Sequence, residues 1–212
     1  QHTDRQTAAT SMIGDPSLTI VEALLRYNEF ARTYYSKDGL PTKEFVEMGL
    51  ALRPVRQLFG TTLAREFGPL RLQALRQHMI DSGLSRGVIN NRVHRVKRCF
   101  RWLVSEQLIP STVYEALRTV DGLKKGRSTA RELPPVTPVD DTDVDAILPF
   151  VSPQVSAMIQ LQRLTGMRPC EVVILRQCEI DMAHDIWVYE PGEHKNAWRG
   201  HDRKIPIGPK GQ

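Results

Sequence analysis

The chain of 212 residues is long enough to bury a hydrophobic core and to form one large or two small domains. Its hydrophobic content of 41% and charged content of 25% are those of an ordinary globular protein. No apolar run approaches the roughly 20 residues that a membrane-spanning helix needs, and no signal peptide is apparent. The composition therefore argues against a membrane-embedded protein and favours a soluble one.

Positive charge is concentrated in the first part of the sequence. Residues 1–135 contain 21 Lys and Arg and 13 Asp and Glu, a net charge of +8. Residues 136–212 contain 8 Lys and Arg and 11 Asp and Glu, a net charge of −3. This asymmetry is typical of a protein whose first part binds a polyanion such as DNA.

The first part of the sequence predicts a bundle of four or five helices. Residues 1–16 are polar and unpatterned and are predicted to be a frayed or disordered lead-in. Apolar residues at helical spacing then predict helices over residues 18–35, 41–59, 70–80, 86–107 and 113–119. Glycine-containing breaks separate the first four of them, and Ser85 is a suitable N-cap for the fourth.

The helix predicted over residues 86–107 combines an apolar face with a strongly basic one. Residues three or four apart define its buried side: Ile89, Val93, Val96, Phe100 and Leu103. Its other faces carry six basic residues with no acid before Glu106: Arg86, Arg92, Arg95, Lys97, Arg98 and Arg101. Uncompensated charges repel one another, and contact with DNA phosphates would relieve that repulsion. The alternative is a solvated basic face.

A change of composition follows the helical part. Residues 121–128 are rich in Gly and Lys, and residues 133–138 are rich in Pro, so residues 121–138 are predicted to be an interdomain linker. The predicted domains are therefore residues 17–120 and residues 139–212. Aspartates open the next predicted helix, which extends to Phe150: Asp140, Asp141 and Asp143.

Residues 164–176 predict a sharp corner between two helices. A helix is predicted over residues 155–164, and Gly166 is the residue type that ends a helix in a left-handed cap. Pro169 suits the first position of the next helix, and Glu171 its first turn. Arg168 is therefore held beside free backbone N–H groups, where a phosphate could bind. Alternatively, Arg168 only pairs with Glu171 and braces the corner.

The region after the corner predicts two strands and no metal site. Strands are predicted over residues 186–189 and 203–207, with His194, Lys195 and Asn196 between them. His194 and His201 lack partners that would complete a zinc ligand set, and aspartates at a helix start are common without a metal. The cysteines also lack ligand spacing and are predicted to be reduced thiols of a cytosolic protein: Cys99, Cys170 and Cys178.

Residues 165–171 (Thr-Gly-Met-Arg-Pro-Cys-Glu), the element Glu179-Ile180-Asp181 and the hairpin with Lys195 follow one another in an informative order. The succession resembles the catalytic domain of tyrosine recombinases, the phage-integrase family. The resemblance covers residues 138–212 and reaches more weakly back to residue 18. It implies a mainly α N-terminal helical bundle, the SAM-like core-binding domain, followed by a truncated α+β catalytic domain with a small antiparallel sheet.

The resemblance also implies a chemistry. The family cuts DNA through a tyrosine that forms a 3′-phosphotyrosyl link, and it uses no metal or other cofactor. By resemblance, Arg168 contacts the scissile phosphate, Lys195 protonates the leaving 5′-oxygen, and Glu171 orients the corner. The implied partner is double-stranded DNA, bound by a homo-oligomer that is a tetramer for the full-length protein. The residues expected to contact DNA are Lys43, Arg86, Asn90, Asn91, Arg92, Arg95, Lys97, Arg98, Lys124, Lys125 and Arg127.

The sequence departs from the family in one respect. The family's His-x-x-Arg pair, a further His or Trp, and its nucleophilic tyrosine follow the hairpin, whereas this sequence ends at Gln212. The tyrosines of this chain all precede that region: Tyr27, Tyr34, Tyr35, Tyr114 and Tyr189. We therefore expect an inactive N-terminal fragment of a cytoplasmic recombinase from a bacterial or phage mobile element, with an incompletely closed C-terminal part. The alternative is a non-catalytic DNA-binding or regulatory protein with the same fold; a type IB topoisomerase is a more distant one.

Overall fold

The computed structural model describes residues 14–192, 200 and 202–212. The chain divides into two compact units between Pro135 and Val136. Within the described ranges, no helix is both long enough and apolar enough to cross a membrane.

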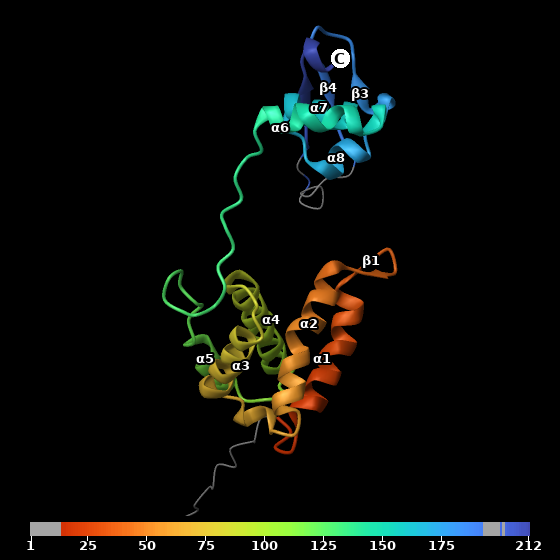
Figure 1. Ribbon diagram of the computed structural model, residues 1–212. Coiled ribbons are helices and arrows are strands. Elements are labelled where there is room, and N and C mark those ends of the chain that lie inside the picture. The colour runs from red at the N-terminus through yellow and green to blue at the C-terminus, as the bar shows by residue number, and fades with distance from the viewer. Residues whose placement is uncertain (1–13, 193–199, 201) are drawn as a thin grey trace, which may run out of the picture. The chain divides into compact units, whose positions relative to one another are not determined.

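In its described residues, the first unit is a helical bundle (Figure 1). Its helices are α1 (Ile20–Tyr34), α2 (Lys43–Phe59), α3 (Pro69–Asp81), α4 (Arg86–Ser105) and α5 (Ser111–Arg118). Thr19 caps α1, and Glu22 completes a capping box by accepting a hydrogen bond from the Thr19 N–H at 2.9 Å. The break predicted after α1 is an antiparallel hairpin of β1 (Ser36–Lys37) and β2 (Leu40–Pro41), which connects α1 to α2. A 3-10 turn, η1 (Ala64–Glu66), precedes α3.

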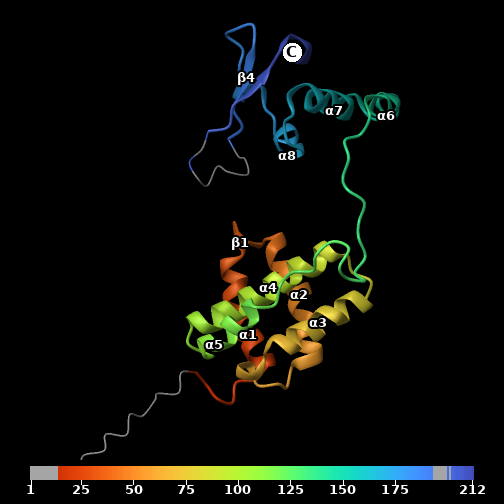
Figure 2. The ribbon, with the colours of Figure 1, turned by 90° about the vertical axis from the view of Figure 1, so that its left-hand side faces the viewer.

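Helix α4 is the central element of the first unit. It packs against α1, α2, α3 and α5, and Figures 1 and 2 show it among the other helices. The predicted apolar face of α4 is confirmed, and the structure adds one residue to it; the buried side chains are Ile89, Val93, Val96, Cys99, Phe100 and Leu103. Phe100 stacks on Phe67 with ring centroids 4.7 Å apart, which joins α4 to the residues just before α3.

Residues 120–131 pack on the first unit. Val120 and Ala130 are buried in its core, and Leu123 packs against that core. Ser85 is the N-cap residue of α4, as predicted, but its side chain makes no capping hydrogen bond. Instead, the N–H of Arg86 donates to the carbonyl of Arg131 at 2.9 Å. Much of the segment predicted as linker is thus held against the first unit.

The second unit combines short helices with a small antiparallel sheet. The helical elements are α6 (Asp141–Ile147), η2 (Leu148–Phe150), α7 (Pro153–Thr165), α8 (Pro169–Val173), η3 (Gln177–Glu179) and η5 (Pro209–Gly211). The strands, in sheet order, are β3 (Ile180–Asp181), β4 (Trp187–Tyr189) and β5 (Ile205–Ile207). Tyr189 is paired with Ile180 on one side and Ile205 on the other. The sequence predicts β4 and β5 as strands but not β3.

The core of the second unit is small. Its buried apolar residues are Met167, Val172, Tyr189, Ile205 and Ile207. Large apolar side chains elsewhere in the unit are exposed: Val139, Ile147, Phe150, Val155, Leu164, Val173, Ile174 and Ile186. The predicted fold class is confirmed for both units, a helical bundle followed by an α+β unit with an antiparallel sheet.

Candidate nucleic-acid interface

The corner at Arg168 has the backbone geometry that the sequence predicts. Helix α7 ends at Gly166, whose φ of 65° places it in the left-handed region, and the N–H of Gly166 donates to the carbonyl of Gln162 at 2.8 Å. Pro169 is the first residue of α8, where its missing N–H has no consequence for helix bonding. Arg168 is thus fixed as the residue between two helices.

Arg168 is anchored by the carboxylate of Glu171. The backbone N–H of Arg168 donates to Glu171 Oε2 at 2.8 Å, and its Nη1 donates to Oε1 at 2.7 Å. The Glu171 side chain is fully buried, whereas that of Arg168 is 41% exposed. The ion pair considered as an alternative for Arg168 is therefore present, and it leaves part of the guanidinium accessible.

A second guanidinium faces the same carboxylate. Arg203, just before β5, has its Nη2 and Nε each 3.4 Å from an oxygen of Glu171. The buried hydroxyl of Tyr189 donates to the backbone carbonyl of Glu171 at 3.0 Å. The sequence predicts Arg203 only as part of the strand over residues 203–207. Its link to the corner joins residues 32 positions apart, so no local pattern could predict it.

The electrostatics of this cluster favour an anion at its surface. Burial by itself would raise the pKa of Glu171, but the hydrogen bonds from Arg168 and Arg203 outweigh burial and lower it. Two cations therefore share one carboxylate, and the excess positive charge lies on half-exposed guanidinium groups. Such groups donate in a geometry that suits phosphate oxygens. Lys195, which the sequence predicts beside this site, lies outside the described residues.

In the first unit, a basic depression of about 640 Å³ lies along α4 and α5. Four of the predicted DNA-contacting residues line it: Asn91, Arg95, Lys97 and Arg98. Its other lining residues are Glu44, His94, Arg101, Tyr114 and Arg118. Lys43 lines a smaller hollow next to Asn91 and Arg95. The sequence did not predict His94, Tyr114 and Arg118 as part of this surface. Tyr114 and Arg118 come from α5, and only the tertiary fold brings them to α4.

The sequence predicts that the basic charges of α4 are uncompensated, and this prediction is wrong. Arg95 makes a two-pronged ion pair with Glu44 of α2, with Nε–Oε1 and Nη2–Oε2 distances of 3.1 and 2.8 Å. Arg98 also pairs with Glu44, and its guanidinium lies 5.1 Å from the ring centroid of Tyr35. The compensating acid comes from another helix, so the sequence of α4 by itself could not reveal it.

Some of the predicted DNA-contacting residues bind the chain itself. Asn90 Nδ2 donates to the Leu123 carbonyl at 3.0 Å, and its Oδ1 accepts from the Leu123 N–H at 2.8 Å. Arg86 pairs with Glu132 at 2.6 Å, and Lys97 donates to the Val120 carbonyl. These three side chains hold residues 120–132 against α4, which is a structural role that the sequence did not predict.

The remaining predicted contacts are less engaged. Lys124, Lys125 and Arg127 are exposed in the segment that follows α5. Arg92 is half-buried, and its Nε is buried without a hydrogen-bond partner. Among the residues that the structure describes, no group of His, Cys, Asp and Glu could hold a metal ion.

No family model and no curated protein matches the amino-acid sequence. Among solved structures, the Tn1549 transposon integrase in complex with a circular intermediate DNA has a TM-score of 0.64 at 15% identity. A lambda integrase tetramer bound to a Holliday junction has a TM-score of 0.67 at 13% identity, as does the XerH site-specific recombinase bound to its difH substrate.

These similarities extend over nearly the whole chain. It is covered to 92%, 98% and 94% in the three comparisons, and it spans 62%, 56% and 68% of the respective chains. At such low identity the comparisons establish the fold. The expected resemblance to tyrosine recombinases and integrases is therefore confirmed at that level.

Replacing Glu171 by Gln tests the anchoring of the corner. We expect the second unit to lose about 1–3 kcal/mol of its free energy of unfolding, because two guanidinium groups lose a buried carboxylate. Since the folded state lowers the pKa of Glu171, this contribution is present above the unfolded pKa of about 4.3 and is lost as the pH falls below it. Urea unfolding monitored by the fluorescence of Trp187 at several pH values measures the difference.

The matched control for that experiment is Glu190→Gln. Glu190 pairs with Lys204 at the surface, where its side chain is 54% exposed, so its replacement should change the stability little. An equal loss for both variants, or a Glu171→Gln effect that is the same at pH 7 and pH 3, would contradict the role given to Glu171.

Replacing Glu44 by Gln tests the ion pairs of α4. Hydrogen bonds from Arg95 and Arg98 lower the pKa of Glu44 to about 2, against an opposing effect of burial. The stabilisation is therefore present above about pH 4.3 and disappears as the pH falls toward 2. Thermal unfolding should show a less stable variant at pH 7 and no difference near pH 2. Glu47→Gln is the control, because Glu47 only approaches Arg95 at 3.9 Å and should matter less.

Proposed function

We propose that this chain binds duplex DNA as part of a site-specific tyrosine recombinase. The observation that carries the proposal is the basic depression on α4 and α5, in a chain whose fold is that of DNA-bound integrases. Five Lys and Arg side chains and one glutamate line the depression. An excess of cations on one surface favours DNA through release of the counterions around its phosphates.

The structure supports different roles for the polar residues of α4 and α5. Arg101 and Arg118 are exposed at the depression, and neither forms an ion pair with another described residue, so they are free to contact phosphates. Arg95 and Arg98 already share Glu44, so phosphates must compete with that carboxylate. Asn90 and Arg86 hold the chain segment that follows α5, and we propose that they act by shaping the surface, not by touching DNA.

We further propose that Arg168 stabilises the scissile phosphate in a longer protein that carries the remaining recombinase motifs. Its guanidinium is fixed by Glu171 yet 41% exposed, so it can add a phosphate oxygen without losing its anchor. Lys195 is proposed as the general acid for the leaving 5′-oxygen. In this scheme the longer protein cuts and rejoins DNA through a 3′-phosphotyrosine in a homo-oligomer in the cytoplasm, with no cofactor.

Fluorescence anisotropy with duplex DNA tests the binding surface. Affinity should fall steeply with salt, and the double variant Arg101→Gln/Arg118→Gln should reduce the slope of log K against log salt by about 1.8, or about 0.9 for each lost phosphate contact. The control, Arg32→Gln/Arg65→Gln, removes two exposed charges elsewhere on the unit and should leave the slope nearly unchanged. Salt-independent binding, or equal effects of the two variants, would refute the assignment.

Covalent DNA adducts test the role of Arg168 in a longer form of the protein that contains the tyrosine motif. Arg168→Ala should reduce adduct formation on a cleavable substrate by about 100-fold or more, because one preorganised donor to the developing charge is lost. DNA affinity should change little. Arg176→Ala, which removes an exposed arginine after α8, is the control and should leave adducts intact. Adducts that persist in Arg168→Ala would exclude the role, and a natural protein that forms none would favour the regulatory alternative.

A further inference from the structure

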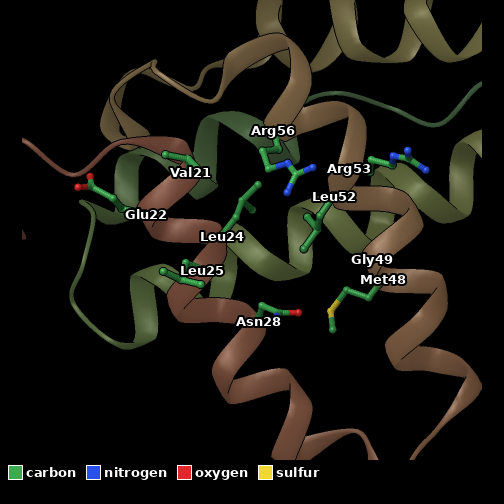
Figure 3. A pocket seen from close by; sticks show the side chains of 10 residues that line it. All are labelled: Val21, Glu22, Leu24, Leu25, Asn28, Met48, Gly49, Leu52, Arg53 and Arg56. Carbon is green, nitrogen blue, oxygen red and sulfur yellow. The ribbon is translucent and has the colours of Figure 1, made fainter.

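An apolar groove of about 630 Å³ lies between α1 and α2 (Figure 3). It is on the first unit, and none of its lining residues lines the basic depression. Leu24, Met48 and Leu52 form its buried apolar part. Figure 3 shows Leu24 and Asn28 of α1 facing Met48 and Leu52 of α2 across the space.

The groove is open to a protein partner. On the α1 side, Leu25 is 59% exposed and Val21 is 43% exposed, which is unusual for adjacent aliphatic side chains on one surface. On the α2 side, Gly49 leaves a gap, because a Cβ built there would have no atom within 4 Å. Gly in a helix interior costs about 1 kcal/mol relative to Ala, and here it leaves space for a side chain from outside.

The charged groups at the groove select an acidic partner. Arg53 and Arg56 of α2 line it and are both exposed, and neither forms an ion pair with another residue that the structure describes. The carboxylate of Glu22 also lies at the groove, and its Oε2 accepts hydrogen bonds from the N–H and the hydroxyl of Thr19 at 2.9 and 2.6 Å. The two arginines outnumber this carboxylate, so the net charge of the groove is positive.

Residues 139–150 of this chain combine exposed apolar side chains with negative charge, which complements the apolar and positively charged groove. Phe150 is 88% exposed and Ile147 is 48% exposed, although both are large and apolar. Four aspartates accompany them: Asp140, Asp141, Asp143 and Asp145. Asp141 and Asp145 pair with Arg163, whereas Asp140 and Asp143 form no ion pair with the described part of the chain. The segment thus presents two free carboxylates and two uncovered apolar side chains.

We propose that the groove between α1 and α2 of one copy binds residues 139–150 of a second copy of this chain. Phe150 enters the gap at Gly49, Ile147 covers the apolar part, and Asp143 faces Arg56. The spacing agrees, because Asp143 and Phe150 are seven residues apart on α6 and η2, about 11 Å along a helix, and so are Arg56 and Gly49 on α2. Every copy carries both surfaces, so the groove of one copy can bind the segment of another.

The proposal deepens the homo-oligomer part of the proposed function and rests on it. The DNA-binding surface is separate, so the two can fail independently. Both are measured on the same variants of the full chain, with sedimentation velocity for self-association in the absence of DNA and anisotropy for DNA binding.

A charge exchange is the main experiment. Arg53→Glu/Arg56→Glu and Asp140→Lys/Asp143→Lys each place like charges across the contact, and each variant should self-associate about tenfold more weakly than the wild type. An equimolar mixture should regain wild-type association, because the groove of either variant then meets a segment of opposite charge on the other variant. The control Arg32→Glu/Arg65→Glu makes the same change of net charge away from the groove and should not weaken association.

A crosslinking experiment identifies the occupant directly. In a background with the exposed Cys170 and Cys178 replaced by Ser, Leu25→Cys and Phe150→Cys are prepared separately, mixed and treated with a short bismaleimide. We expect a crosslinked pair of chains. The pairing of Phe150→Cys with Leu70→Cys is the control. Leu70 is 80% exposed on α3 but does not line the groove, so this pairing should give little product.

Several outcomes would overturn the proposal. These are a wild-type chain that stays monomeric, a mixture of charge variants that fails to recover, or equal crosslinking to Leu25→Cys and Leu70→Cys. A Leu25→Cys/Phe150→Cys double variant that crosslinks only within one chain would also refute binding between copies. If DNA binding is normal in these cases, the proposed function stands and only this inference fails.

Discussion

A buried carboxylate has to be neutralised by its surroundings, and in the second unit this requirement organises the candidate site. Glu171 is fully buried, and its oxygens receive the backbone N–H and guanidinium of Arg168 together with the guanidinium of Arg203. The unit has a small apolar core, so these polar contacts are a large share of what fixes α8 against the sheet. The same contacts leave positive charge on the surface, because two cations share one anion. Stabilisation of the corner and exposure of positive charge at its surface are therefore consequences of one interaction.

In the first unit, α4 has three different faces. One is buried in the core, one holds residues 120–132, and one lines the basic depression. Glu44 limits the electrostatic attraction of that depression, since it neutralises part of the charge of Arg95 and Arg98 and orients both guanidinium groups. Arginines that are already held in place lose less conformational entropy when they bind than free ones do. A partly compensated surface therefore has a weaker non-specific attraction but a more defined geometry.

The sequence predicts local structure well where a single residue type decides it. Gly166 and Pro169 require a helix stop followed by a helix start, because one adopts the left-handed conformation and the other cannot donate a helix hydrogen bond. The apolar spacing on residues 86–107 likewise determines which side of α4 is buried. The short strand β3 was missed, because two residues are too few to show a period.

The sequence by itself thus determined the helical bundle, the corner at Arg168 and the concentration of positive charge in the first part of the chain. Only the tertiary structure decided which charges are free. Glu44 reaches Arg95 across 51 positions, Glu132 reaches Arg86 across 46, and Arg203 reaches Glu171 across 32. Helical and strand periods describe neighbours along the chain, whereas ion pairs depend on distance in space. For this reason the basic face of α4 could be predicted from the sequence, but the partners of its arginines could not.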